Sequence, residues 1–273
     1  MVRLTILLLV LGVVCPSARA QSSYDLYGSA RADGLGNSTT ALASAIGVHA
    51  NPAARAALSR PTAQFYARQS FGLSALRYGA THAAVPFGWG TVSTGLSTFG
   101  FEEYREVHAT LGYARGLSFG TSRAVRVGVA LRYHHTSIAG YGSAGTVGLN
   151  LGLGVSLLRS LHLGAHATNV NGAVLADGEP LPRTLAVGLA YEALKTVHVT
   201  AEVFKDIRFP ASVRGGIEVQ PVAPLFLRAG VTTTPVRFAG GAGVRLGSLR
   251  AQVAAEQHQT LGWSPSASLQ VQW

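Results

Sequence analysis

The most regular stretch of the chain is VGLNLGLGVSL, residues 147–157. Its odd-numbered positions are all valine or leucine, and its even-numbered positions are glycine, asparagine or serine. Because successive side chains of a β-strand point to opposite faces, the pattern predicts a strand with one apolar face and one small or polar face. A run of 11 residues is long for a strand of a soluble protein and suits a tilted strand that crosses a bilayer.

The same alternation recurs along most of the chain after residue 60. Within residues 125–133, for example, valine, leucine and tyrosine alternate with Arg126, Gly128, Ala130 and Arg132. In a soluble sheet the second face would carry many Lys, Glu and Thr, but here it carries Gly, Ala, Ser and isolated Arg. An arginine on a lipid-facing position costs about 2–4 kcal/mol at the bilayer midplane, so these arginines are expected to face inward. The sequence therefore predicts an all-β fold, a transmembrane antiparallel β-barrel.

Turn signals between the alternating segments divide residues 61–273, the predicted barrel, into fourteen candidate strands. The first three alternate poorly, so twelve strands is the alternative, and either number satisfies the even count of bacterial barrels. The candidates are 62–70, 73–86, 90–99, 105–116, 124–138, 144–157, 160–170, 183–193, 196–206, 211–220, 224–234, 236–246, 249–257 and 265–273.

The composition agrees with a barrel and excludes other classes. Charged residues make up 12 %, about half the usual share of a soluble domain. Beyond residue 20 no apolar run reaches the length of a transmembrane helix, and 48 % apolar residues exclude disorder. The net charge is +10, but the positive residues are scattered singly, which argues against nucleic-acid binding.

The first 60 residues do not alternate. Residues 1–20 predict a signal peptide, with Arg3 before an apolar core and Ala18-Arg19-Ala20 at the cleavage site, so we expect export to the bacterial outer membrane. Residues 21–60, here called the hatch segment, predict short helices over Ser38–Ile46 and after Asn51-Pro52-Ala53. Because the inner faces of the strands are small, we expect this segment to lie in the lumen.

The candidate site consists of the charged residues on the polar faces of the strands. Their arginines could attract anions into the lumen, or they could pair with glutamates and with the hatch segment. The expected lumen-lining arginines are Arg126, Arg132, Arg214, Arg228, Arg237, Arg245 and Arg250, and their expected partners are Glu202, Glu218 and Glu256.

Motifs of catalysis and metal binding are not found in the sequence. There is no phosphate-binding glycine loop, zinc-binding histidine pair on a helix or nucleophile elbow. His162 and His166 share a strand face but lie ~13 Å apart at ~3.3 Å per residue, too far to chelate one ion. We therefore expect a non-enzymatic protein without cofactor, catalytic residues or metal site.

Three stretches together resemble a known family. The first is Gly34-Leu35-Gly36 followed by Asn51-Pro52-Ala53; the second joins Asn171-Gly172, Pro180-Leu181-Pro182 and Gly188-Leu189-Ala190-Tyr191. The third is Arg214 to Glu218, Leu227 to Gly230 and Ala239 to Val244. The chain resembles the PorV/PorQ-like outer-membrane proteins, a branch of the long-chain fatty acid transporter-like β-barrels. The resemblance implies fourteen strands, an N-terminal hatch and an accessory role in type IX protein secretion.

Two other functions stay open, a transporter of small hydrophobic molecules and a passive pore or structural barrel. The expected partners are outer-membrane lipid and lipopolysaccharide, secretion components or a small hydrophobic ligand, and the barrel assembly machinery. The terminal aromatic Trp273, which ends an alternating strand, is the predicted assembly signal.

Overall fold

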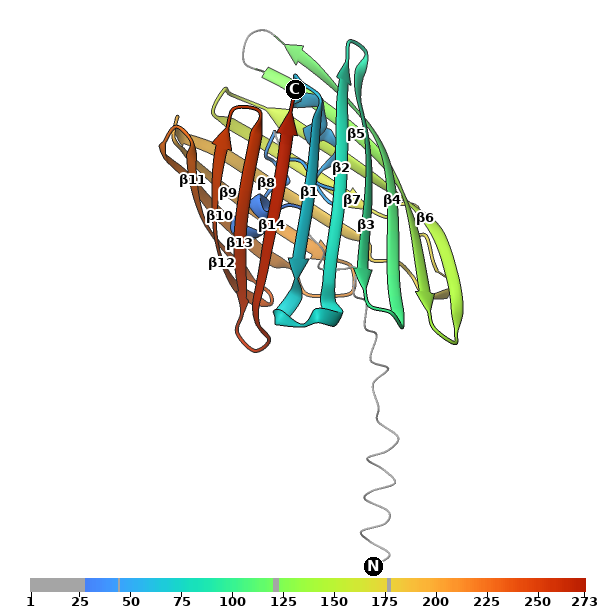
Figure 1. Cartoon of the computed structure of the whole chain (residues 1–273). Coiled ribbons are helices and arrows are strands. Elements are labelled where there is room, and N and C mark those ends of the chain that lie inside the picture. Colours follow the sequence, from blue (N-terminus) through green and yellow to red (C-terminus); the bar gives the residue numbers. More distant parts are fainter. Residues whose placement is uncertain (1–27, 44, 120–122, 176–177) are drawn as a thin grey trace, which may run out of the picture.

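The computed structural model describes residues 28–43, 45–119, 123–175 and 178–273. The predicted signal peptide and the start of the hatch segment lie outside the described residues. Within the described part, fourteen antiparallel strands form a closed barrel in which each strand pairs with its sequence neighbours and β1 pairs with β14 (Figure 1). The strands are β1 (Thr62–Gln69), β2 (Arg77–Phe87), β3 (Gly90–Gly100), β4 (Tyr104–Phe119), β5 (Arg123–Ile138), β6 (Gly142–Ser156), β7 (Leu161–Thr168), β8 (Thr184–Leu194), β9 (Val197–Asp206), β10 (Ser212–Val222), β11 (Leu225–Thr233), β12 (Val236–Leu246), β13 (Leu249–His258) and β14 (Gly262–Gln272).

The predicted barrel of fourteen strands is confirmed, and the alternative of twelve is wrong. The largest difference in a boundary is at the second strand, which begins at Arg77 rather than at residue 73. The short 3-10 helices η3 (Ser70–Gly72) and η4 (Ser74–Leu76) connect β1 to β2. Phe71 has a φ of 55°, which is incompatible with extended backbone, so the poor alternation of this stretch reflects a connection rather than a strand.

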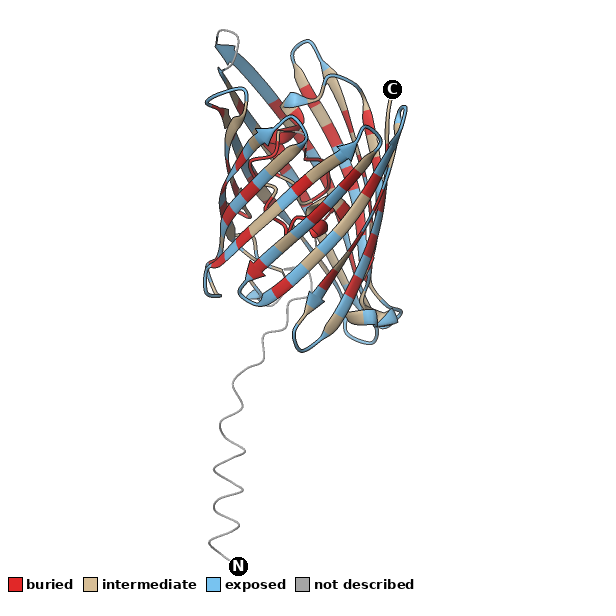
Figure 2. Ribbon diagram, turned by 90° about the vertical axis from the view of Figure 1, so that its left-hand side faces the viewer, coloured by how far each residue is buried: buried red, intermediate tan, exposed pale blue. Residues whose placement is uncertain are grey.

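Burial alternates along the strands (Figure 2), and most of the buried side chains on the strands are polar. In β6, Val147, Leu151 and Leu153 are 46 %, 46 % and 41 % exposed, whereas Asn150 is 4 % exposed. A soluble protein would bury the opposite set. The barrel therefore presents its apolar side chains outward, as a protein surrounded by lipid does.

The described part of the hatch segment contains two short helices, which lie inside the ring of strands (Figure 1). The α-helix α2 (Ala30–Gly34) begins after Ser29, whose Oγ accepts a hydrogen bond from the Ala32 N–H at 3.1 Å, and it packs against β12 and β13. The 3-10 helix η2 (Pro52–Ala57) packs against β4, β5 and β6. Neither of them, nor any other helix in the described residues, is long and apolar enough to cross a membrane.

The helix predicted over Ser38–Ile46 is wrong. Apart from Ser44, which is outside the described residues, these residues form turns and irregular backbone. The reason is that the barrel wall hydrogen-bonds to this stretch: the Thr40 N–H donates to Glu202 at 3.0 Å, and the Ser38 hydroxyl lies 2.6 Å from that of Thr200. These tertiary hydrogen bonds outweigh the weak helical preference of the alanines.

Candidate functional site in the barrel lumen

Asn51 joins three parts of the lumen. Its Oδ1 accepts the Ala53 N–H at 3.0 Å and so caps η2, with Pro52 in the first helical position that suits proline. Its Nδ2 donates to the Thr40 carbonyl at 2.8 Å and to the Leu153 carbonyl of β6 at 3.0 Å. One buried side chain thus ties η2 to the preceding stretch and to the barrel wall.

Glycines on the inner faces allow the hatch segment to approach the wall closely. A Cβ on Gly152 would overlap the Asn51 amide, and a Cβ on Gly230 would overlap the backbone of Gly36. Contacts of this kind leave no room for any side chain at these two positions. The small inner faces recognised in the sequence are therefore occupied by backbone of the hatch segment.

Glu218 of β10 connects the hatch segment to the wall through two arginines. Arg31 of α2 binds it with two hydrogen bonds, Nε to Oε2 at 3.0 Å and NH2 to Oε1 at 2.7 Å. Arg228 of β11 donates from Nε to Oε2 at 2.6 Å. Charge-assisted hydrogen bonds of this geometry, in a buried place, are much stronger than surface ion pairs.

A second charged cluster surrounds Asp33 of α2, which is fully buried. The Tyr66 hydroxyl donates to Asp33 Oδ2 at 2.7 Å, and Arg68 NH1 lies 3.6 Å from Oδ1. Arg68 and Arg237 both reach Oε1 of Glu256, at 2.8 and 3.3 Å. Burial raises the pKa of the Asp33 carboxyl to about 6, and the Arg68 guanidinium opposes that rise.

Glu202 of β9 anchors the middle of the hatch segment. Its Oε2 accepts the Thr40 N–H, and Arg214 NH1 donates to its Oε1 at 3.4 Å. The Arg214 guanidinium also stacks on the ring of Phe204, with 3.7 Å between its carbon and the ring centroid. This carboxylate therefore has partners in both the hatch segment and the wall.

Arg132 of β5 binds the turn that precedes Asn51. Its NH1 donates to Nδ1 of His49 at 2.9 Å, and its NH2 donates to the Val48 carbonyl. Since a guanidinium only donates, His49 Nδ1 is the acceptor and Nε2 carries the proton toward the Tyr78 hydroxyl, 3.0 Å away. Burial and the charge of Arg132 hold the pKa of His49 well below its usual range, so this imidazole is neutral.

The remaining predicted residues lie apart from these clusters. Arg126 is buried and donates to the Ser156 hydroxyl at 3.1 Å, with no glutamate partner among the described contacts. Arg245 is exposed and Arg250 is half-buried, and the two residues are paired directly across β12 and β13. Their guanidinium carbons lie 5.1 and 5.2 Å from the centroid of the Phe226 ring. Trp273 follows β14 and is 62 % exposed.

Several functional residues were missed by the sequence analysis. Arg31 and Asp33 of α2 and Arg55 of η2, which donates to His82 Nε2 at 3.0 Å, belong to the hatch segment. Arg68 lies on β1, where apolar and polar residues alternate poorly in the sequence although burial alternates in the structure. The signal that was available is the presence of charged side chains in a stretch otherwise rich in Ala, Gly and Ser, because a buried charge in such a stretch needs a partner.

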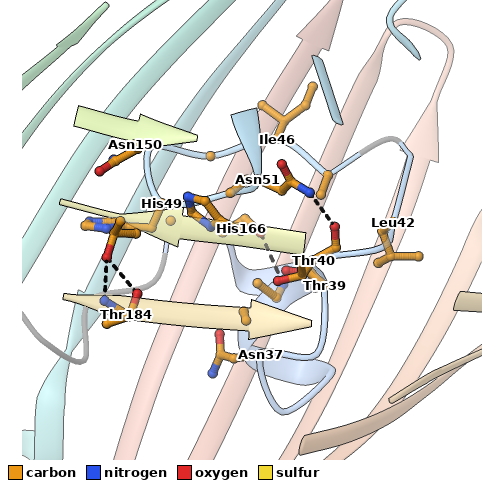
Figure 3. Close-up of a pocket in the computed structure, with 18 of the residues that line it drawn as sticks. Asn37, Thr39, Thr40, Leu42, Ile46, His49, Asn51, Asn150, His166 and Thr184 are labelled. Carbon is orange, nitrogen blue, oxygen red and sulfur yellow. Dashed lines mark hydrogen bonds between the residues drawn. The ribbon is translucent and has the colours of Figure 1, made fainter. Parts of the chain in front are cut away.

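A cavity of about 140 Å³ remains between the hatch segment and the strands. Figure 3 shows that its lining comes from both, with Asn37, Thr40 and Asn51 on the hatch side and His166 and Thr184 on β7 and β8. The described residues contain no group of three His, Cys, Asp or Glu side chains placed to hold a metal ion. The lining provides hydrogen-bonding groups, apolar surface and the charged side chains of Arg31, Arg132, Glu202 and Arg214.

Comparisons with solved structures identify the class of protein. The fold matches CymD, a monoaromatic hydrocarbon channel (TM-score 0.66, 11 % identity, 90 % of this chain and 97 % of that chain). It also matches the Pseudomonas putida toluene transporter TodX (TM-score 0.60, 14 % identity, 90 % of this chain and 97 % of that chain) and a Pseudomonas aeruginosa FadL homologue (TM-score 0.57, 10 % identity, 90 % and 98 %). No family model and no curated protein sequence matches the chain.

The protein is a bacterial outer-membrane β-barrel, as its fold and apolar exterior require. Within that class its fold is similar to that of the FadL-like hydrocarbon channels. The predicted outer-membrane location is confirmed, and the fold agrees with the broader part of the family resemblance. The finer resemblance to the PorV/PorQ branch stays a prediction.

Proposed function

We propose that the protein is a channel for small hydrophobic molecules across the outer membrane. The observation that carries this proposal is the hatch segment inside the closed barrel, which leaves a cavity of about 140 Å³. A lumen filled in this way favours a single small molecule over bulk passage of water and polar solutes. The similar folds of a toluene transporter and a monoaromatic hydrocarbon channel support the same choice.

The proposal includes a structural role for the lumen arginines. Arg132, Arg214 and Arg228 bind the hatch segment directly or through a glutamate that also binds it. Arg214 and Arg228 are paired with glutamates, and Arg132 donates to the neutral His49 and to the Val48 carbonyl. We therefore assign these arginines to holding the hatch segment in place rather than to attracting anions.

An uptake assay tests the transport function. Cells that carry the gene and cells that lack it would be compared for the initial rate of uptake of labelled toluene and of a labelled disaccharide. We expect faster toluene uptake in the cells with the gene and equal disaccharide uptake in the two. Equal toluene uptake would reject the channel, and faster disaccharide uptake would point to a passive pore.

The sequence motifs shared with the PorV/PorQ branch favour a second candidate, an accessory of type IX secretion. For this function the cells with and without the gene would be compared for their secreted and surface-attached proteins. Loss of a set of surface proteins without the gene would favour secretion, whereas an unchanged protein profile would eliminate it.

A further inference from the structure

We propose that the lumen cavity binds one small, neutral, single-ring molecule that carries a hydroxyl group, in preference to a plain hydrocarbon. The inference rests on the proposed transport function and names the substrate class for it. It follows from the size of the cavity, from buried polar groups that lack partners, and from the partners that Glu202 and Arg132 already have.

The size of the cavity fits one aromatic ring. Its volume is about 140 Å³. An apolar cavity of about 150 Å³ engineered in another protein binds benzene. Leu42, Ile46 and Leu181 contribute apolar surface on which a ring can pack.

Several buried polar side chains of the lining have hydrogen-bonding groups without a partner among the described residues, namely Asn37, His166, Gln252 and Arg214. Asn37 is 5 % exposed, and neither its Oδ1 nor its Nδ2 has a partner among the described residues. His166 is 8 % exposed, and its Nε2 also lacks one. Because buried polar groups are nearly always hydrogen-bonded, an amide and an imidazole left open in one cavity indicate a ligand that bonds to them.

The backbone holds Asn37 at this place. Its φ is 62°, in the left-handed region where glycine and asparagine are the best-tolerated residues, and its N–H donates to the Ala32 carbonyl at 2.8 Å. A glycine would satisfy the same backbone with less strain. The amide group is thus the only thing that asparagine adds here, and it lines the cavity (Figure 3).

The charged residues of the lining define the charge of the ligand. Glu202 accepts from Thr40 and Arg214, and Arg132 donates to His49 and Val48. Glu202 is thus paired with a cation and Arg132 is bonded to neutral groups, so the open amide of Asn37 and the open imidazole nitrogen of His166 are the groups that select the ligand. A hydroxyl group both donates and accepts and so satisfies an amide or an imidazole, whereas a hydrocarbon satisfies neither and a carboxylate would be repelled by Glu202.

Calorimetric titration of the purified full-length protein in detergent, with phenol and toluene as probes and empty micelles subtracted, tests this inference. We expect phenol to bind with one-to-one stoichiometry and at least about fivefold more tightly than toluene, the effect of one good hydrogen bond. Asn37→Gly, which suits the left-handed backbone, and His166→Leu should each weaken phenol binding about fivefold and change toluene binding less than twofold. His162→Leu is the matched control, because His162 lies on the same face of β7 outside the cavity and should leave both affinities unchanged.

Equal affinities for phenol and toluene, or equal losses for both in the two variants, would overturn the inference. So would a structure of the phenol-soaked protein with only water in the cavity. If toluene uptake by cells still depends on the gene, such a result rejects the hydroxylated substrate and leaves the proposed channel standing. If neither compound enters faster with the gene while phenol still binds, the proposed channel function fails instead.

Discussion

Glu218 accepts hydrogen bonds from two arginines that come from different parts of the fold, Arg31 of the hatch segment and Arg228 of the wall. In the Glu218→Gln variant two largely buried guanidinium groups would share a neutral amide. Removing one partner of a buried ion pair costs about 3–5 kcal/mol, so we expect the free energy of unfolding to fall by about 3 kcal/mol. Urea unfolding in detergent micelles measures this change. The control is Glu102→Gln, at an exposed position, which should leave the free energy of unfolding nearly unchanged. An equally small change in both variants would contradict the role given to Glu218.

Leu151 tests which side of the strand faces lipid. It is 46 % exposed on the outer face of β6, and the adjacent Asn150 is buried in the lumen. In Leu151→Arg a charge would face hydrocarbon near the middle of the strand, at a cost of about 2–4 kcal/mol. Unfolding from lipid vesicles should show this loss, with Leu151→Phe unchanged within about 1 kcal/mol. If the arginine variant were as stable as the wild type, lipid would not be the solvent of this face.

The strands and the hatch segment differ in how far the sequence predicts them. Alternation is a local property that is clear over residues 147–157, and most of the strand candidates agree with the observed strands except at their ends. The first three candidates alternate poorly, which is why the sequence left twelve strands as an alternative. The Ser38–Ile46 stretch has its structure dictated from outside, by Glu202 and Thr200 of β9. Helical preference alone therefore gives the wrong answer there, because it takes no account of hydrogen bonds to a distant strand.

The glycines of β6 allow a matched test of how the hatch segment fits. A Cβ on Gly152 would overlap Asn51, whereas a Cβ on Gly148 would meet Asn169 Oδ1 at 3.5 Å, an ordinary contact. We expect Gly152→Ala to displace the Asn51-Pro52 turn and to make the hatch segment sensitive to added protease. Overpacking of this kind costs about 1–3 kcal/mol. Gly148→Ala should resist protease like the wild type; equal resistance of both variants would show that the close approach at Gly152 is unimportant.

The site as a whole is predicted from sequence only in part. The alternation of apolar and polar residues along each strand is enough to place Arg214, Arg228 and Arg237 on inner faces, without any knowledge of the fold. The long-range pairs of the site are not predicted in this way, because Arg31 of the hatch segment and Glu218 lie 187 residues apart in the chain, and Arg68 and Glu256 of the wall lie 188 apart. Such pairs exist only once β1 meets β14 and the ring closes around the hatch segment, which no local pattern reports.

Ion flow through a planar bilayer tests whether the hatch segment fills the lumen of the whole molecule. With α2 and η2 bound to opposite parts of the wall, the full-length protein should give little or no steady current. Deleting residues 28–57 would expose the lumen arginines to water, where a charge needs no partner, so the barrel should still insert and then conduct in discrete steps. The remaining positive lining should make that current selective for anions. Steady current through the full-length protein, or a silent deletion variant that has inserted correctly, would show that the hatch segment is not what closes the barrel.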